Sequence, residues 1–101
     1  MKRMINANDL PEFEVSDYLE DADAIAEYLT IVLEDGDPSL LIAALGDIAR
    51  AKGMSEVSRE SGLAREALYK ALRAGAQPRF DTVMRVIKTL GVRLVAQPLT
   101  A

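Results

Sequence analysis

The chain has 101 residues, enough for one domain with a modest buried core. It contains no cysteine and no histidine, which removes disulfides, most zinc sites and the usual nucleophile and general-base arrangements. We therefore expect no enzyme and no metal or other cofactor. The net charge is −4, but residues 1–37 carry 2 bases and 11 acids (2 − 11 = −9), whereas residues 38–101 carry 10 bases and 5 acids (10 − 5 = +5). Two halves of opposite sign predict two different partners.

The first fifteen residues show no periodicity, and we expect a flexible arm in which residues 13–15 form at most a short edge strand. Ser16 then offers a cap for one helical turn ending at Leu19. Residues 22–35 have apolar side chains at the spacing of one helix face, with Asp21 and Gly36 suited to cap the two ends. The side chains expected to face inward are those of Ile25, Tyr28, Leu29, Val32 and Leu33.

The opposite side of this helix is acidic, with the aliphatic Ile31 lying between Glu27 and Glu34. Two interpretations stay open for it: a solvated helix face, or a docking surface for a basic protein. Under the second interpretation Tyr18 joins Glu27, Ile31 and Glu34 as a partner-binding candidate. Phe13 and Tyr18 fit equally well in the core.

Asp37 and Pro38 predict the start of a second helix, which extends to about Ala51 and is terminated by Gly53. The two-residue link makes it an antiparallel neighbour of the first helix. Since this helix is apolar on nearly all sides, we expect it at the centre of the domain. We expect Leu41, Ala44, Leu45 and Ile48 on its buried side, and Ser39, Ala43, Gly46, Asp47 and Arg50 on its outer side.

Residues 55–72 have the spacing of a helix-turn-helix, with Val57 inside the first helix and Gly62 at the turn. Ser58 is small enough for the second helix to pass close by, and Leu63, Leu68 and Leu72 are expected to point into the core. A helix in the DNA major groove presents a stripe of cations and hydrogen-bond donors. An ordinary helical hairpin with a solvated face is the alternative. The stripe left on the outside consists of Arg65, Glu66, Tyr69, Lys70 and Arg73.

After a loop at residues 73–78, apolar spacing predicts a last helix that closes at Leu90 and Gly91. Its inward residues are expected to be Phe80, Val83, Met84 and Ile87. Residues 92–97 are β-branched and alternating, so we expect a short strand. This strand must pair with residues 13–15, pair with its copy in a second subunit, or fray. Phosphate contacts are expected at helix ends and loops, from Lys52, Ser55, Gln77 and Arg79.

Three motifs resemble the probable addiction-module antidote family, a HigA-like group of bacterial antitoxins. They are GDPSLLIAALGDIARAKG at 36–53, GLAREALYKAL at 62–72 and PRFDTVMRVIKTLG at 78–91. Residues 15–19 and the acidic helix extend the resemblance to about 13–97, while residues 38–90 resemble the lambda-repressor and Cro type of DNA-binding domain. The implied fold is all-α and compact, with five helices and a helix-turn-helix. We expect a flexible arm at 1–15, an acidic helical extension at 16–37, the DNA-binding domain at 38–91 and a C-terminal strand and tail at 92–101.

The resemblance implies the antitoxin of a type II toxin–antitoxin module. The missing cysteines and the lack of an apolar run long enough for a signal segment or a membrane span lead us to expect a cytoplasmic protein. It would neutralise a small basic RelE/ParE-like toxin and, as a homodimer, repress its own operon at an inverted-repeat operator. We expect the dimer interface at Val92, Leu94 and Val95. One departure is Ala64, where the family tends to have a serine that caps the recognition helix. The alternatives are a stand-alone helix-turn-helix regulator without a toxin, or a protein-binding module that no longer reads DNA.

Overall fold

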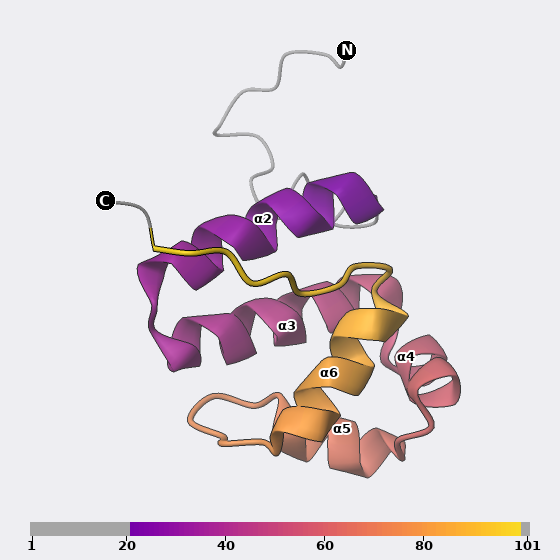
Figure 1. The fold of residues 1–101 in the computed structure, drawn as a ribbon. Coiled ribbons are helices and arrows are strands. Elements are labelled where there is room, and N and C mark those ends of the chain that lie inside the picture. The colour runs from indigo at the N-terminus through magenta and orange to yellow at the C-terminus, as the bar shows by residue number, and fades with distance from the viewer. Residues whose placement is uncertain (1–20, 100–101) are drawn as a thin grey trace, which may run out of the picture.

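The computed structural model describes residues 21–99, which form five helices and no strand. The turn expected at 16–19, the partner candidate Tyr18 and the pairing expected at 13–15 lie outside this range. None of the helices within 21–99 is long and apolar enough to cross a membrane. In the labels of Figure 1 the helices are α2 (Ala22–Asp35), α3 (Pro38–Lys52), α4 (Met54–Ser61), α5 (Arg65–Ala71) and α6 (Phe80–Thr89).

The first two helices begin at the predicted capping residues. The Asp21 carboxylate accepts a hydrogen bond from the Asp23 amide at 3.3 Å, and the Asp37 carboxylate accepts one from the Ser39 amide at 2.9 Å. Between them Gly36 takes a left-handed conformation with φ of 86°, which reverses the chain. As predicted, α2 and α3 are therefore antiparallel neighbours (Figure 1).

One apolar core joins all five helices, and α3 lies at its centre as predicted, in contact with α2, α4 and α6. Leu45 and Ile48 of α3 are completely buried. The other helices contribute side chains from their inward faces, which include Ile25, Leu29, Val57, Leu68, Val86 and Ile87.

A tight turn joins α4 to α5, and its polar groups are satisfied locally. Gly62 takes a φ of 79°, and its amide donates to the Ser58 carbonyl oxygen at 3.0 Å. The Ser58 hydroxyl donates to the carbonyl oxygen of Leu63, whose amide donates to Ser61 Oγ at 3.2 Å. This network fixes the direction in which α5 leaves the turn. As predicted, Leu68 and Leu72 are buried, whereas Leu63 is only partly buried against the core.

Gly46 was predicted on the outer side of α3, and this is wrong, because Gly46 is buried. A Cβ at this position would lie 3.0 Å from the carbonyl oxygen of Leu72. The glycine therefore lets the backbone that follows α5 pass close to α3. Helical spacing alone does not reveal such an approach, since it depends on a segment 26 residues further along the chain.

The predicted inward positions of Leu33, Phe80 and Met84 are also wrong, since all three side chains are exposed, that of Phe80 by 70 %. The buried face of α6 is centred between Val83, Val86, Ile87 and Leu90. At about 100° per residue, Phe80 and Met84 lie on the flank of that face. Leu33 has the corresponding position on α2, beyond Ile25 and Leu29.

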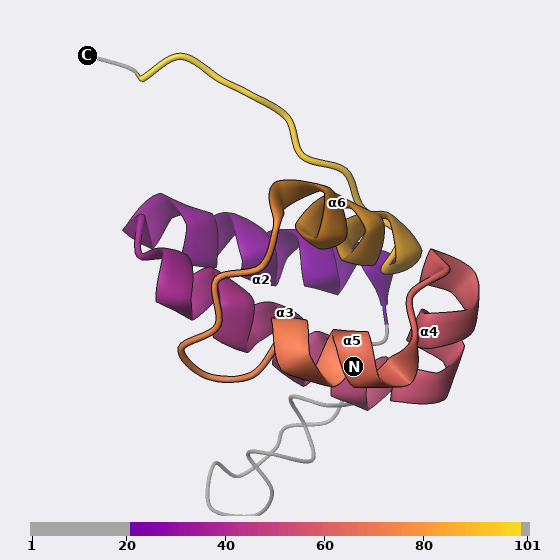
Figure 2. The ribbon, with the colours of Figure 1, turned by 90° about the horizontal axis from the view of Figure 1, so that it is seen from below.

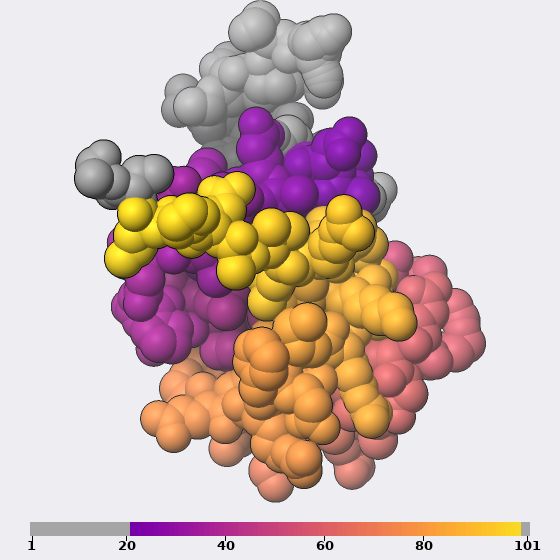
Figure 3. All heavy atoms as spheres, in the orientation of Figure 1, coloured from indigo at the N-terminus to yellow at the C-terminus, as the bar shows by residue number. Residues whose placement is uncertain are grey.

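The strand predicted at 92–97 is not formed within the described chain. The Val92 amide donates to the Ile87 carbonyl oxygen at 3.5 Å, and among residues 21–99 no backbone hydrogen bond involves residues 93–99. Figures 1 and 3 show this segment crossing in front of α2 from its beginning towards its end. A Cβ on Gly91 would lie 3.6 Å from that of Ala22, so the segment starts beside the first turn of α2. The sequence favours a strand, but a strand needs a paired neighbour.

Candidate functional site

The outer side of α5 carries the stripe that the sequence predicted. Leu68 and Leu72 hold the opposite side in the core, so the position of α5 follows from its packing. In Figure 2, which views the molecule from below, α5 lies at the front between α4 and the loop that leads to α6. All five predicted residues are exposed, namely Arg65, Glu66, Tyr69, Lys70 and Arg73.

Arg65 and Tyr69, one helical turn apart, interact directly. Arg65 Nη2 donates to the Tyr69 hydroxyl at 3.0 Å, and Arg65 Cζ lies 5.5 Å from the centre of the Tyr69 ring. The ring thus attracts the cation and the hydroxyl fixes its orientation. Because a guanidinium has five N–H donors, both terminal nitrogens keep a free N–H. The arginine therefore keeps N–H donors for further acceptors, such as those on the major-groove edge of guanine.

The four residues predicted to contact phosphate lie at helix ends or in a loop, as expected, and differ in exposure. Lys52 is the last residue of α3 and partly buried, while Ser55 is exposed in the first turn of α4. Gln77 is exposed in the loop after α5. Arg79 precedes α6 and already pairs with Asp81, with Nε to Oδ1 at 3.2 Å and Nη2 to Oδ2 at 3.4 Å. Arg79 is consequently less available to a phosphate than Gln77.

The predicted acidic surface lies on α2. Glu27, Ile31 and Glu34 are all exposed, and 64 % of Ile31 is accessible. Residues 21–37 contain six acids and no base. An aliphatic side chain is therefore exposed within a region of strongly negative charge.

A groove of about 650 Å³ lies between α2 and residues 92–99. Sequence analysis missed it, because only the path of the C-terminal segment along α2 creates it. The exposed Leu33 lies in this groove, and so do the three residues predicted for a dimer interface, Val92, Leu94 and Val95. Glu34 and Arg93 add one charge of each sign.

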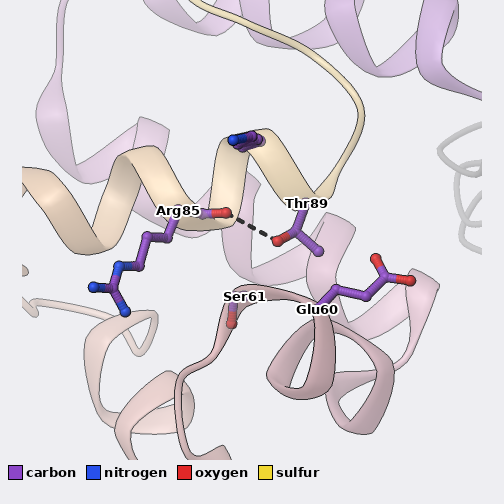
Figure 4. A pocket seen from close by; sticks show the side chains of 5 residues that line it. Glu60, Ser61, Arg85 and Thr89 are labelled. Atoms are coloured by element: carbon purple, nitrogen blue, oxygen red, sulfur yellow. Dashed lines mark hydrogen bonds between the residues drawn. The ribbon is translucent and has the colours of Figure 1, made fainter.

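A second, polar hollow of about 400 Å³ lies between α4 and α6 (Figure 4). The Ser61 hydroxyl accepts from the Leu63 amide within the turn, and the Thr89 hydroxyl donates to the Arg85 carbonyl oxygen at 2.9 Å. Both hydroxyls thus have local structural roles. Arg85 and Lys88 share the hollow with Glu60, and this mixture of charges favours no particular class of ligand.

The chain was compared with known proteins, and residues 9–98 match the model of a family described as probable addiction module antidote protein. The chain belongs to this family. An uncharacterized protein of Haemophilus influenzae is 42 % identical over 88 residues, which cover 87 % of this chain and 91 % of the relative. No solved structure matches the chain. An antidote acts against a toxin, so membership of this family implies a toxin partner and a role that is generally not enzymatic.

Proposed function

We propose that this antidote neutralises a small basic toxin and represses its own operon, with α4 and α5 acting as a helix-turn-helix on operator DNA. Family membership supports the first half of the proposal. The observation that carries the second half is the exposed stripe along α5, where Arg65, Tyr69 and Lys70 lie opposite the buried Leu68 and the exposed Arg73 follows just beyond the end of the helix.

In this proposal α5 enters the major groove and α4 lies across the phosphate backbone. Arg65, at the start of α5, reaches a guanine through its two free donors. Glu66 accepts a hydrogen bond from a cytosine amino group or orients Arg65. Lys70 and Arg73 contact phosphates, together with Lys52, Ser55 and Gln77, and Arg79 joins them by exchanging Asp81 for a phosphate.

The proposal includes a homodimer. A two-fold dimer reads an inverted repeat whose half-sites lie about one helical turn apart. It also includes toxin binding by the acidic half of the chain, where Glu27 and Glu34 attract a basic protein and Ile31 provides an apolar anchor.

Binding to the DNA upstream of the gene tests the repressor half. The double variant Arg65→Ala/Lys70→Ala should lose more than 1–3 kcal/mol of binding free energy, since truncating a single base-reading arginine loses about that much. Arg85→Ala/Lys88→Ala, which removes the same charge from α6, is the matched control and should lose much less. Equal operator affinity of the two double variants would refute the role of α5.

Co-purification with the product of the neighbouring reading frame, expected to be rich in Lys and Arg, tests the antidote half. Ile31→Arg combined with Glu27→Lys should weaken this complex and leave DNA binding intact. A wild-type chain that binds the upstream DNA but not this product would instead be a stand-alone regulator.

A further inference from the structure

The C-terminal segment combines a β-favouring sequence with a backbone that makes few hydrogen bonds to the described part of the chain. Residues 92–97 alternate and include β-branched side chains, yet among residues 21–99 no backbone hydrogen bond reaches residues 93–99. Within residues 21–99, the extended backbone therefore has a row of N–H and C=O groups without a backbone partner. Such an edge pairs readily with a strand from another chain.

The groove beside this segment is suited to the side chains of such a strand. Its wall on α2 runs from Ala26 to Glu34, about 12 Å at 1.5 Å per residue, the length of three to four strand residues. Leu29, Leu33 and Leu94 provide apolar contacts. A strand paired with the segment would place every second side chain over this surface.

Charge indicates which protein supplies the strand. If the segments of two copies paired, their α2 helices would approach each other, each within a region of six acids and no base (residues 21–37). Like charges at an interface oppose association. Glu34 and Arg93 offset each other within the groove, so it is the acidic region around α2 that attracts a basic partner and repels a second copy.

We propose that residues 93–97 become a β-strand by pairing with an edge strand of a basic protein, whose side chains enter the groove along α2. The inference rests on the proposed function, in which the basic partner is the toxin. It moves Leu94 and Val95 from the expected dimer interface to the toxin interface.

Proline substitutions at neighbouring positions test the pairing, with the purified product of the adjacent reading frame as the probe. Along a strand, successive N–H groups point to opposite edges, so a single partner strand uses only every second one. Leu94→Pro and Val95→Pro remove adjacent N–H donors, and Leu94→Ala and Val95→Ala control for the lost side chains. One proline variant should bind about tenfold more weakly than its alanine control, and the other about as well as its own control.

Two results would overturn the pairing. If neither proline variant binds more weakly than its alanine control, the backbone makes no contact with the partner. If both proline variants are weakened equally, the partner depends on the backbone conformation of the segment and not on hydrogen bonds along one of its edges. In either case the proposed function stands if the wild-type chain still captures the probe, and it fails in its antidote half if the wild-type chain does not.

Hydrogen exchange identifies the occupant. The amides of residues 93–97 should exchange without protection in the free protein at every concentration, and alternate ones should become protected when the probe is added. Protection that appears in the free protein as its concentration rises would show a second copy in the groove and overturn the assignment. As a charge test, Glu34→Lys should weaken capture of the probe several-fold more than Glu60→Lys on α4, with the larger difference at low salt.

Discussion

Tyr69 combines two contacts to Arg65, and a conservative substitution separates them. Tyr69→Phe keeps the ring beside the guanidinium and removes the hydroxyl that accepts from Nη2. Since one hydrogen bond contributes about 0.5–1.5 kcal/mol, the variant should bind operator DNA roughly two- to tenfold more weakly and discriminate less at the guanine. The measurement is a titration of matched and mismatched operators. Tyr28→Phe on α2 is the control, and an unchanged Tyr69→Phe would contradict a role for the hydroxyl.

Ala64 leaves the start of α5 without a side-chain cap. Its backbone is extended, with φ of −64° and ψ of 148°, as a capping residue requires, but no side chain bonds the free amides. Ala64→Ser should raise the free energy of unfolding by about 1 kcal/mol, measured by urea denaturation. Ala67→Ser, inside the same helix, should not stabilise the protein. A destabilised Ala64→Ser variant would show that the serine hydroxyl does not accept a hydrogen bond from a free amide of α5.

Gly46 marks the closest approach between α3 and the end of α5. Gly46→Val would place a branched side chain against the Leu72 carbonyl oxygen, 3.0 Å from the position of the new Cβ. Overpacking of this kind lowers the free energy of unfolding by about 1–3 kcal/mol. Ala43→Val on the exposed side of α3 should change it by less than about 0.5–1 kcal/mol. Equal urea midpoints for the two variants would show that the end of α5 moves to accommodate the new side chain.

Helix α6 shows that helical spacing only partly predicts which side chains are buried. Phe80 is the largest apolar residue of this helix but is mostly exposed, whereas Ile87 is almost completely buried. Ile87→Ala should therefore lower the free energy of unfolding by about 2–5 kcal/mol, and Phe80→Ala by well under 1 kcal/mol. Thermal unfolding of both variants measures the difference. A large loss for Phe80→Ala would mean that its ring is covered in solution.

The elements themselves were largely predictable, because their signals are local. Asp21, Asp37 and Gly36 set the ends of α2 and α3 through contacts within a few residues. Errors arose where distant segments decide the outcome. Gly46 is buried because Leu72 passes it, and residues 92–97 lack a strand because no strand lies beside them in the chain described. The stripe on α5 was predicted from spacing, but the groove required the path of the C-terminal segment.

The charge of the whole molecule is divided, so the negative half is suited to a basic protein and the positive half to DNA. The half from residue 38 onward is positive although the whole chain carries −4, so binding of operator DNA is expected to depend steeply on salt. The plot of log affinity against log salt concentration has a negative slope, and its magnitude should decrease by about one when Lys70→Gln removes one phosphate contact. Fluorescence titration measures this slope. Lys88→Gln is the control with the same charge change. If both slopes fall equally, the general field is responsible and not a contact.

Removal of residues 93–101 tests whether the stability of the helical core depends on the C-terminal segment. Among residues 21–99, the buried core consists of side chains between Ala24 and Leu90, and no backbone hydrogen bond lies beyond Val92. The truncated protein should therefore unfold within about 2–3 °C of the full chain, since little apolar surface is lost. It should lose capture of the probe. Sedimentation that shows a dimer converted to a monomer would return Val92, Leu94 and Val95 to the dimer interface.

A Cβ on Gly91 would lie within van der Waals distance of Ala22 Cβ, so the described helical body begins and ends at one corner. Proteins whose ends meet tolerate a change in the order of their segments. A short linker from Gly91 to Ala22, with new ends opened at the exposed Gly75, would run α6 and α2 as consecutive helices and keep the buried core residues of all five helices. The packing of these five helices therefore does not require α2 to be the first of them in the chain.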